Sequence, residues 1–220
     1  MKYFWIIILL IIVFFGWKIM SMEKENNINY VVILVPGLND SGESKLIKNI
    51  WKKDGIDIIF FESKWKSDEN YQIKLERLLK LIDEKSENNK VSLIGMSAGG
   101  SLVINAFNER KNEINKVIAI CSRLKKGKES GFRGFVKRTK KSLSFKESIL
   151  NSEKDINDFS LEERQRIMTI HALFGDELVP GDTSTIDGAN NVIIPTTEHV
   201  FSIVSSLTWY SKLLVEFVIN

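Results

Sequence analysis

Gly95-Met96-Ser97-Ala98-Gly99 is the segment of this sequence with the clearest capacity for chemistry. It has the pattern G-x-S-x-G and it ends the apolar run Val91–Gly95. Glycines on both sides of a serine let a strand and a helix approach closely, so that the hydroxyl stands clear on a sharp turn. The helix N-terminus beyond it favours developing negative charge. Ser97 is therefore the candidate nucleophile, and the alternative is a small-residue turn that only packs a helix on a strand.

A serine hydroxyl needs a base near neutral pH, and the chain has only two histidines. His171 lies inside the apolar pattern Ile167–Phe174, which favours a packed strand residue. His199 follows the apolar run Asn191–Ile194 and begins a closing helical segment. That position is a loop at the carboxyl edge of a sheet, where Ser97 is also expected. We therefore predict that His199 is the base.

The base in turn needs a carboxylate to orient it. Asp176 comes directly after the strand pattern that ends at Phe174, and Gly175 permits a turn there. Three other acids compete for this role: Glu177, Asp182 and Asp187. Asp176 is favoured because its neighbours end a buried strand. The chain order Ser97, Asp176, His199 is the order expected for a G-x-S-x-G motif on a parallel sheet.

An alternating series of strands and helices is predicted to position these residues. Six apolar runs predict strands: Tyr30–Val35, Ile56–Phe61, Val91–Gly95, Lys116–Ile120, Ile167–Phe174 and Asn191–Ile194. Helical spacing of apolar residues predicts four helices: Glu43–Lys53, Asn70–Lys85, Ser97–Arg110 and Val200–Val218. The alternation predicts an α/β fold, a parallel sheet with helices on both faces.

The insert at residues 122–166 separates the fourth and fifth strands and has no strand pattern. Residues 122–150 hold ten Lys or Arg against two Glu, and residues 151–187 hold nine acids against three bases. An insert this long predicts a helical cap, or lid, over the carboxyl edge of the sheet. A solvated basic loop is the alternative, and contact with anionic lipid or with an acidic substrate would be a more specific role. Nucleic acid is not expected, because few aromatic residues interleave with the basic ones.

The N-terminus carries a separate apolar segment. Tyr3–Trp17 is uncharged and lies between Lys2 and Lys18. Fifteen helical residues span about 22 Å, somewhat less than a hydrocarbon core of about 30 Å, and Ile19 extends the apolar reach. We expect residues 1–22 to be an uncleaved membrane anchor, with 23–29 as a linker. A cleaved signal peptide and a buried core helix are the alternatives. A short basic start before an apolar run predicts a single-pass protein with its domain outside the cytoplasm.

Composition excludes several classes of site. The chain of 220 residues has one cysteine, Cys121, which excludes a disulfide framework and a multi-cysteine zinc site. Two histidines leave too little material for a His-rich metal site. We therefore expect no metal and no cofactor. The net charge of +3 is close to neutral only because the basic insert precedes an acidic stretch.

Four segments together resemble the α/β-hydrolase superfamily, on its esterase and lipase side: VVILVPGLND, VSLIGMSAGG, ALFGDELVP and TTEHVFSI. The resemblance covers roughly residues 30–220, and the insert stands where this family usually carries its lid. It implies a minimal α/β-hydrolase fold with about six mostly parallel strands, because the antiparallel strands that usually come first have no room. It also implies a serine nucleophile, a histidine base, an aspartate, an acyl-enzyme intermediate and no cofactor.

The same resemblance implies an oxyanion hole built from two backbone N–H groups. One would come from Ala98, directly after the nucleophile. The second would come from the loop after the first strand, at Leu38. The family often has His-Gly in that loop, whereas this chain has Pro36-Gly37. Only a backbone amide is needed there, so we expect little loss.

The function predicted from the sequence is that of a membrane-anchored serine hydrolase. Its substrate would be a small-molecule or lipid-derived carboxylic ester. A thioesterase or acyltransferase on the same triad would use the same chemistry. Two further alternatives involve no catalysis. One is a binding module that keeps the fold, and the other is a membrane-surface scaffold in which the basic insert is the functional part. The heavy use of Lys, Asn and Ile points to an AT-rich, bacterial genome.

Overall fold

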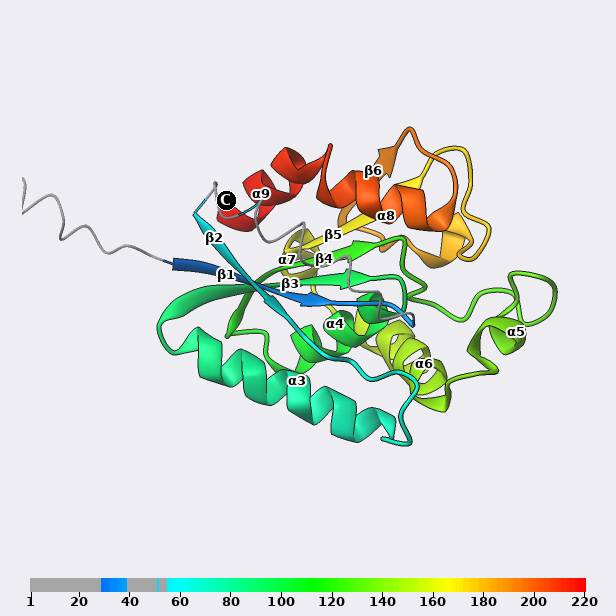
Figure 1. The fold of residues 1–220 in the computed structure, drawn as a ribbon, viewed down its shortest axis with the longest axis horizontal. Coiled ribbons are helices and arrows are strands. Elements are labelled where there is room, and N and C mark those ends of the chain that lie inside the picture. The colour runs from blue at the N-terminus through cyan, green and yellow to red at the C-terminus, as the bar shows by residue number, and fades with distance from the viewer. Residues whose placement is uncertain (1–28, 39–50, 52–54) are drawn as a thin grey trace, which may run out of the picture.

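One parallel sheet of six strands forms the centre of the molecule (Figure 1). The computed structural model describes residues 29–38, 51 and 55–220. The expected anchor, the linker and most of the expected helix at 43–53 lie outside these described residues. The strand order is β2-β1-β3-β4-β5-β6, and all five pairings are parallel. The bounds are β1 (Asn29–Val35), β2 (Ile56–Phe60), β3 (Asn89–Met96), β4 (Ile114–Ile120), β5 (Ile167–Ala172) and β6 (Asn190–Ile194). All six predicted strands are confirmed.

Helices cover both faces of the sheet, which is why the strands are apolar on both sides. In the view of Figure 1, α3, α4 and α6 lie below the sheet and α8 and α9 lie above it. Two separate clusters of buried apolar residues fill the spaces between the sheet and these layers. The bounds are α3 (Tyr71–Ser86), α4 (Ala98–Glu109), α5 (Phe135–Thr139), α6 (Leu143–Asp158), α7 (Leu161–Gln165), α8 (His199–Leu207) and α9 (Ser211–Ile219), with a short 3-10 helix at Gly181–Thr183.

Helix α3 shows how the sequence pattern produces this layer. The Asn70 side chain accepts a hydrogen bond from the backbone N–H of Ile73 at 2.9 Å, so the helix begins with a satisfied cap. The predicted apolar stripe is buried against the sheet: Tyr71, Leu75, Leu78, Leu79 and Ile82. The prediction of a helix over 70–85 is confirmed to within one residue at each end.

The insert differs from the predicted cap. Its long helix, α6, lies in the helical layer beside α4 and α3, and its buried residues Phe145, Ile149 and Ile156 belong to the core cluster of that face. The Ser148 and Ser101 hydroxyls are hydrogen-bonded at 2.8 Å across the α4–α6 interface. Only α5 and its flanking loops lie beyond the carboxyl ends of the strands (Figure 1). The expectation that the whole insert caps that edge is therefore wrong for α6, whose apolar stripe packs on α4 instead.

The closing helix predicted over 200–218 is two helices, α8 and α9, bent by 58°. The break begins at Thr208, whose N–H bonds back to Ser205 and whose hydroxyl donates to the Val204 carbonyl at 2.8 Å. The carbonyl of Leu207, the last residue of α8, accepts the indole N–H of Trp51 at 3.2 Å. The last turn is thus satisfied without continuing the helix. Among the described residues no single helix has the length and hydropathy of a membrane span, although α8 and α9 taken together would pass by composition.

The burial of α6 gives a prediction about stability. Ile149→Ala removes a side chain that is fully buried, so we expect a loss of about 2–5 kcal/mol in the free energy of unfolding. The matched control is Leu150→Ala, which truncates the neighbouring residue, 42% exposed, and should change stability by less than about 1 kcal/mol. Urea denaturation measures both. Equal, small losses would mean that α6 is a loosely held lid.

Candidate active site

Ser97 occupies a strained turn between β3 and α4. Its backbone has φ 53° and ψ −116°, a region that side-chain-bearing residues rarely adopt. The Ser97 N–H donates to the carbonyl of Ile120 on the next strand at 2.9 Å, which fixes the turn against β4. The strand–turn–helix context predicted for the G-x-S-x-G pattern is confirmed.

Three glycines permit this turn. A Cβ atom on Gly95 would lie 2.5 Å from the Gly99 carbonyl oxygen and from the Gly100 Cα. A Cβ atom on Gly99 would overlap the Val35 carbonyl oxygen of β1, and one on Gly100 would overlap the Ser122 hydroxyl. Helix α4 therefore starts in direct backbone contact with the strands, which leaves no room for a methyl group.

Ser97, His199 and Asp176 form one continuous line of hydrogen bonds. His199 Nε2 lies 2.8 Å from Ser97 Oγ, and His199 Nδ1 lies 2.6 Å from Asp176 Oδ2. Both His199 and Asp176 are more than nine-tenths buried. Because an ionised carboxylate only accepts, Nδ1 carries the proton and Nε2 is free to accept from the Ser97 hydroxyl. The structure thus brings together the three side chains that the sequence singled out.

The loops after β5 and β6 bring Asp176 and His199 together. Gly175, with φ 99°, turns the chain directly after β5, and its carbonyl accepts the N–H of Glu198 at 3.2 Å. The Glu198 side chain caps α8 by accepting the N–H of Phe201 at 2.7 Å. Asp176 Oδ1 accepts the N–H groups of Leu178 and Val179, at 2.7 and 2.9 Å. These two bonds orient the carboxylate so that Oδ2 points at the imidazole.

Glu177 has a role that the sequence does not reveal. By sequence it competes with Asp176 for the orienting role, yet its carboxylate accepts the backbone N–H of His199 at 2.9 Å. The imidazole of His199, within the part of the chain that the structure describes, bonds only Asp176 and Ser97. Consecutive acids therefore hold the same histidine, one by its ring and one by its backbone.

The basic insert also contacts the loop after β5 (residues 173–180), here called the acid loop. The sequence does not reveal this contact. Arg133 donates to the Asp176 carbonyl at 3.1 Å, and Arg138 donates to the Glu177 carbonyl at 3.0 Å. Beneath them, the buried Arg123 donates to the carbonyls of Arg133 and Lys126, each at 2.7 Å. Burial lowers the pKa of Arg123, and the nearby Asp182 partly opposes that effect. The only hint in the sequence is that a basic stretch precedes an acidic one.

The loop expected to complete an oxyanion hole lies against Ser97, the predicted nucleophile. A Cβ atom on Gly37 would lie 3.0 Å from Ser97 Cβ and 3.5 Å from Ser97 Oγ. Leu38 follows, half-buried and packed on the core cluster of the α4 face. Ala98 is the first residue of α4, where backbone N–H groups have no partner within the helix. The two predicted donors thus belong to segments that flank Ser97.

Two other reactive residue types lie apart from this line. His171 lies inside β5, paired with Ile193, and burial lowers the pKa of its imidazole. The expectation that it is a packed strand residue agrees with this position. Cys121 is buried at the end of β4, and burial raises the pKa of its thiol, so the thiol stays protonated. Within the described ranges no three His, Cys, Asp or Glu residues gather as a metal site would require.

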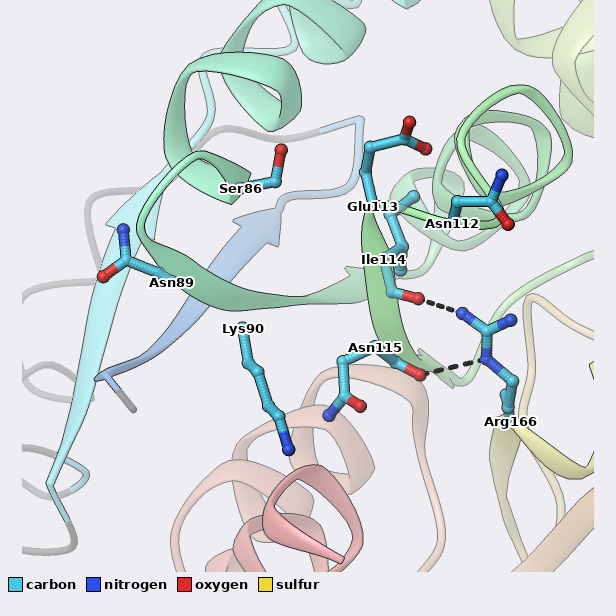
Figure 2. A pocket seen from close by; sticks show the side chains of 8 residues that line it. All are labelled: Ser86, Asn89, Lys90, Asn112, Glu113, Ile114, Asn115 and Arg166. Atoms are coloured by element: carbon cyan, nitrogen blue, oxygen red, sulfur yellow. Dashed lines mark hydrogen bonds between the residues drawn. The ribbon is translucent and has the colours of Figure 1, made fainter. Parts of the chain in front are cut away.

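A hollow of about 470 Å³ lies at the opposite edge of the sheet, by the amino ends of β3 and β4 (Figure 2). Figure 2 shows that its Arg166 points at the backbone carbonyls of Ile114 and Asn115, to which it is hydrogen-bonded. A third bond joins this guanidinium to the Lys111 carbonyl at 2.7 Å. The Arg166 guanidinium therefore already has backbone carbonyls as hydrogen-bond partners. The hollow lies at the other edge of the sheet from Ser97 and forms no part of that site.

No protein-family model matches the chain, and no curated protein matches it by sequence. Solved structures do match. Est1E from Butyrivibrio proteoclasticus, seen with bound ferulic acid, is 12% identical with a TM-score of 0.60, over 89% of this chain and 93% of that one. A monoacylglycerol lipase from Paleococcus ferrophilus is 17% identical with a TM-score of 0.59, over 86% and 93%. An alpha/beta hydrolase enzyme from a sediment metagenome of the Mar Chica lagoon, Morocco, is 16% identical with a TM-score of 0.57, over 86% and 90%.

This chain has the α/β-hydrolase fold. At such low identities the likeness shows the shared fold alone. The six parallel strands match the minimal version of the fold that the sequence predicted, although the membrane-spanning part of that prediction lies outside the described residues.

The close contact at Gly99 gives a prediction about the turn. Gly99→Ala places a methyl group against the Val35 carbonyl, so we expect a loss of about 3 kcal/mol or more in the free energy of unfolding. Gly181→Ala is the matched control, because the nearest atom to its new Cβ would be 3.9 Å away, on His171. That control should change stability by less than about 1 kcal/mol. Urea denaturation compares the two, and a well-tolerated Gly99→Ala would contradict the packing described.

Proposed function

We propose that this protein is a serine hydrolase that cleaves carboxylic esters through an acyl-enzyme intermediate. Ser97 is the nucleophile, His199 the general base and Asp176 the residue that orients the base. The observation that carries the proposal is the line of hydrogen bonds from Ser97 through His199 to Asp176, at 2.8 and 2.6 Å. The monoacylglycerol lipase among the structural neighbours supports the choice of an ester as substrate.

The geometry supports a two-step reaction. His199 Nε2 takes the proton from Ser97 Oγ as that oxygen attacks the ester carbonyl carbon. The new oxyanion accepts hydrogen bonds from the N–H groups of Ala98 and Leu38. When the tetrahedral intermediate collapses, His199 gives its proton to the departing alcohol and the acyl group stays on Ser97. Water then attacks the acyl-enzyme with His199 again as base, which releases the carboxylic acid and restores Ser97.

Asp176 stays ionised throughout this cycle. Its Oδ1 is occupied by the N–H groups of Leu178 and Val179, so Oδ2 alone faces the imidazole. The carboxylate keeps the proton on Nδ1 in the resting enzyme and stabilises the imidazolium that forms in each step. No metal or cofactor takes part in the proposed reaction.

We propose further that the enzyme works at a membrane, with residues 1–22 as its anchor and the domain outside the cytoplasm. Contact of the domain with a membrane is supported by the surface around α5, next to the loop after β5. Phe132 and Val136 are 62% and 56% exposed, and the Lys137 and Arg138 cations lie 4.7 and 4.6 Å from the Phe132 ring centre. Exposed apolar side chains with basic side chains beside them are suited to contact with an anionic lipid surface. Such contact would bring lipid-derived esters to the site.

Covalent labelling tests the proposed nucleophile. A fluorophosphonate probe should label the protein on Ser97, and Ser97→Ala should abolish both labelling and the hydrolysis of nitrophenyl esters. Ser101→Ala is the control, because Ser101 lies one turn into the same helix and its hydroxyl bonds the Ala98 carbonyl and Ser148. It should label like the wild type. Labelling of Ser97→Ala, or an unlabelled wild type, would end the proposal.

A chain-length panel then separates the subtypes of this reaction. Esters, the corresponding thioesters and an added alcohol acceptor distinguish an esterase from a thioesterase and from an acyltransferase. A protein that binds these ligands and turns over none of them would be a binding module with this fold.

Vesicle experiments test the membrane surface. The triple variant Lys137→Gln, Lys140→Gln, Lys141→Gln spares Arg138, which bonds the acid loop. We expect activity on an ester in phosphatidylglycerol vesicles to fall at least about fivefold, because the three lysines together contribute from about 1 to about 3 kcal/mol of attraction. Activity on a soluble short-chain ester should stay the same. High salt should remove the difference on vesicles. An equal loss on both substrates would show that these lysines serve the site instead.

A further inference from the structure

Trp65 contacts the segment after β1, which faces Ser97, without belonging to the triad. It stands in the loop after β2, and its side chain is almost completely buried, with 3% exposed. Its indole N–H donates to the carbonyl oxygen of Pro36 at 3.0 Å. Pro36 directly follows β1 and precedes Gly37 and Leu38. The one polar group of a buried tryptophan is thus aimed at the backbone of the loop that faces Ser97.

This bond restrains a peptide that would otherwise turn easily. The Pro36 carbonyl and the Gly37 N–H belong to one planar peptide group, so fixing the carbonyl direction fixes the plane. Gly37 has no side chain to limit its dihedral angles, and a Cβ there would lie 3.0 Å from Ser97 Cβ, closer than an ordinary contact. The next peptide carries the Leu38 N–H. The indole bond therefore fixes the peptide on one side of Gly37, while the packing of Leu38 on the core cluster holds the other side.

Trp65 is itself held firmly. Its ring packs edge-on against Phe145 of α6, with centroids 5.9 Å apart, and its carbonyl accepts the Ser142 hydroxyl at 3.3 Å. The preceding residue, Lys64, has φ 48°, and its carbonyl accepts the ammonium of the fully buried Lys74 at 2.5 Å. The loop around Trp65 is thus held both by the buried ammonium of Lys74 on α3 and by the start of α6.

We propose that Trp65 is a positioning residue for the oxyanion-stabilising loop. Its indole N–H holds the Pro36–Gly37 peptide so that the Leu38 N–H faces the place where the oxyanion forms before any ester binds. Preorganised donors stabilise the transition state more than the bound substrate, so this contact affects kcat rather than KM. Helix α6 of the insert takes part through Phe145. This inference rests on the proposed hydrolase function and adds a residue to it.

The test is Trp65→Phe, which keeps an aromatic ring for Phe145 and removes the N–H. We expect kcat for a soluble nitrophenyl ester to fall about tenfold, less than the loss of a direct oxyanion donor, while KM stays within about twofold. A trifluoromethyl ketone, which binds serine as an oxyanion-bearing adduct, should lose affinity by the same factor as kcat. A role in packing alone would not link these two quantities.

Trp51→Phe is the matched control. Trp51 is equally buried and its indole N–H also bonds a backbone carbonyl, that of Leu207, on the opposite face of the sheet. It should lose stability as Trp65→Phe does and keep its kcat. If Trp65→Phe does not fold, 3-benzothienylalanine at position 65 replaces the N–H by sulfur and keeps the shape.

The outcomes separate this inference from the function on which it rests. An unchanged kcat in folded Trp65→Phe overturns the inference, as does a fall in kcat with unchanged affinity for the ketone. An equal fall in Trp51→Phe also overturns it, because the effect would then be general destabilisation. An active Ser97→Ala variant would instead overturn the proposed function itself.

Discussion

The backbone of Ser97 is held in a conformation that costs about 1–3 kcal/mol, and the rest of the site depends on how that strain is supported. Close contact between α4 and three strands supports it, through glycines at 95, 99 and 100 and through the bond from Ser97 N–H to Ile120. The same contact places the hydroxyl above the carboxyl edge. The loops after β1, β5 and β6 begin at that edge as well, because all six parallel strands end there. The position of the strained Ser97 thus determines where His199 and Asp176 must lie in order to contact it.

Much of this arrangement could be predicted from the sequence, because the features concerned leave local patterns. Strands buried on both faces must be apolar throughout, so YVVILV and KVIAI are recognisable without their neighbours. A turn that excludes side chains demands glycine, so Gly95 and Gly99 mark Ser97. The scarcity of histidine then leaves His199 as the base, and Asp176 follows from its place directly after a strand.

Other features could not be predicted, because they depend on contacts that no local pattern encodes. The apolar stripe of α6 is the same whether it covers the carboxyl edge or packs on α4. The break between α8 and α9 depends on Thr208 and on an indole N–H from Trp51, 156 positions away from its partner Leu207. Glu177 and Trp65 act through backbone groups, which every residue has, so their partners are invisible in a sequence. A sequence pattern therefore predicts which face of a helix or strand is apolar, but not which element packs against that face.

The arginines of the insert bond backbone carbonyls of the acid loop and leave its carboxylates alone. Had Arg133 or Arg138 paired with the Asp176 or Glu177 side chains, they would have competed with His199 for the same oxygen atoms. A guanidinium stays charged at any pH that a folded protein tolerates, and a carbonyl has no proton to gain. Such contacts are also screened by salt less than a pair of opposite charges is. The arginine contacts to this loop therefore do not depend on the protonation of a carboxylate, and they leave both carboxylates available to His199.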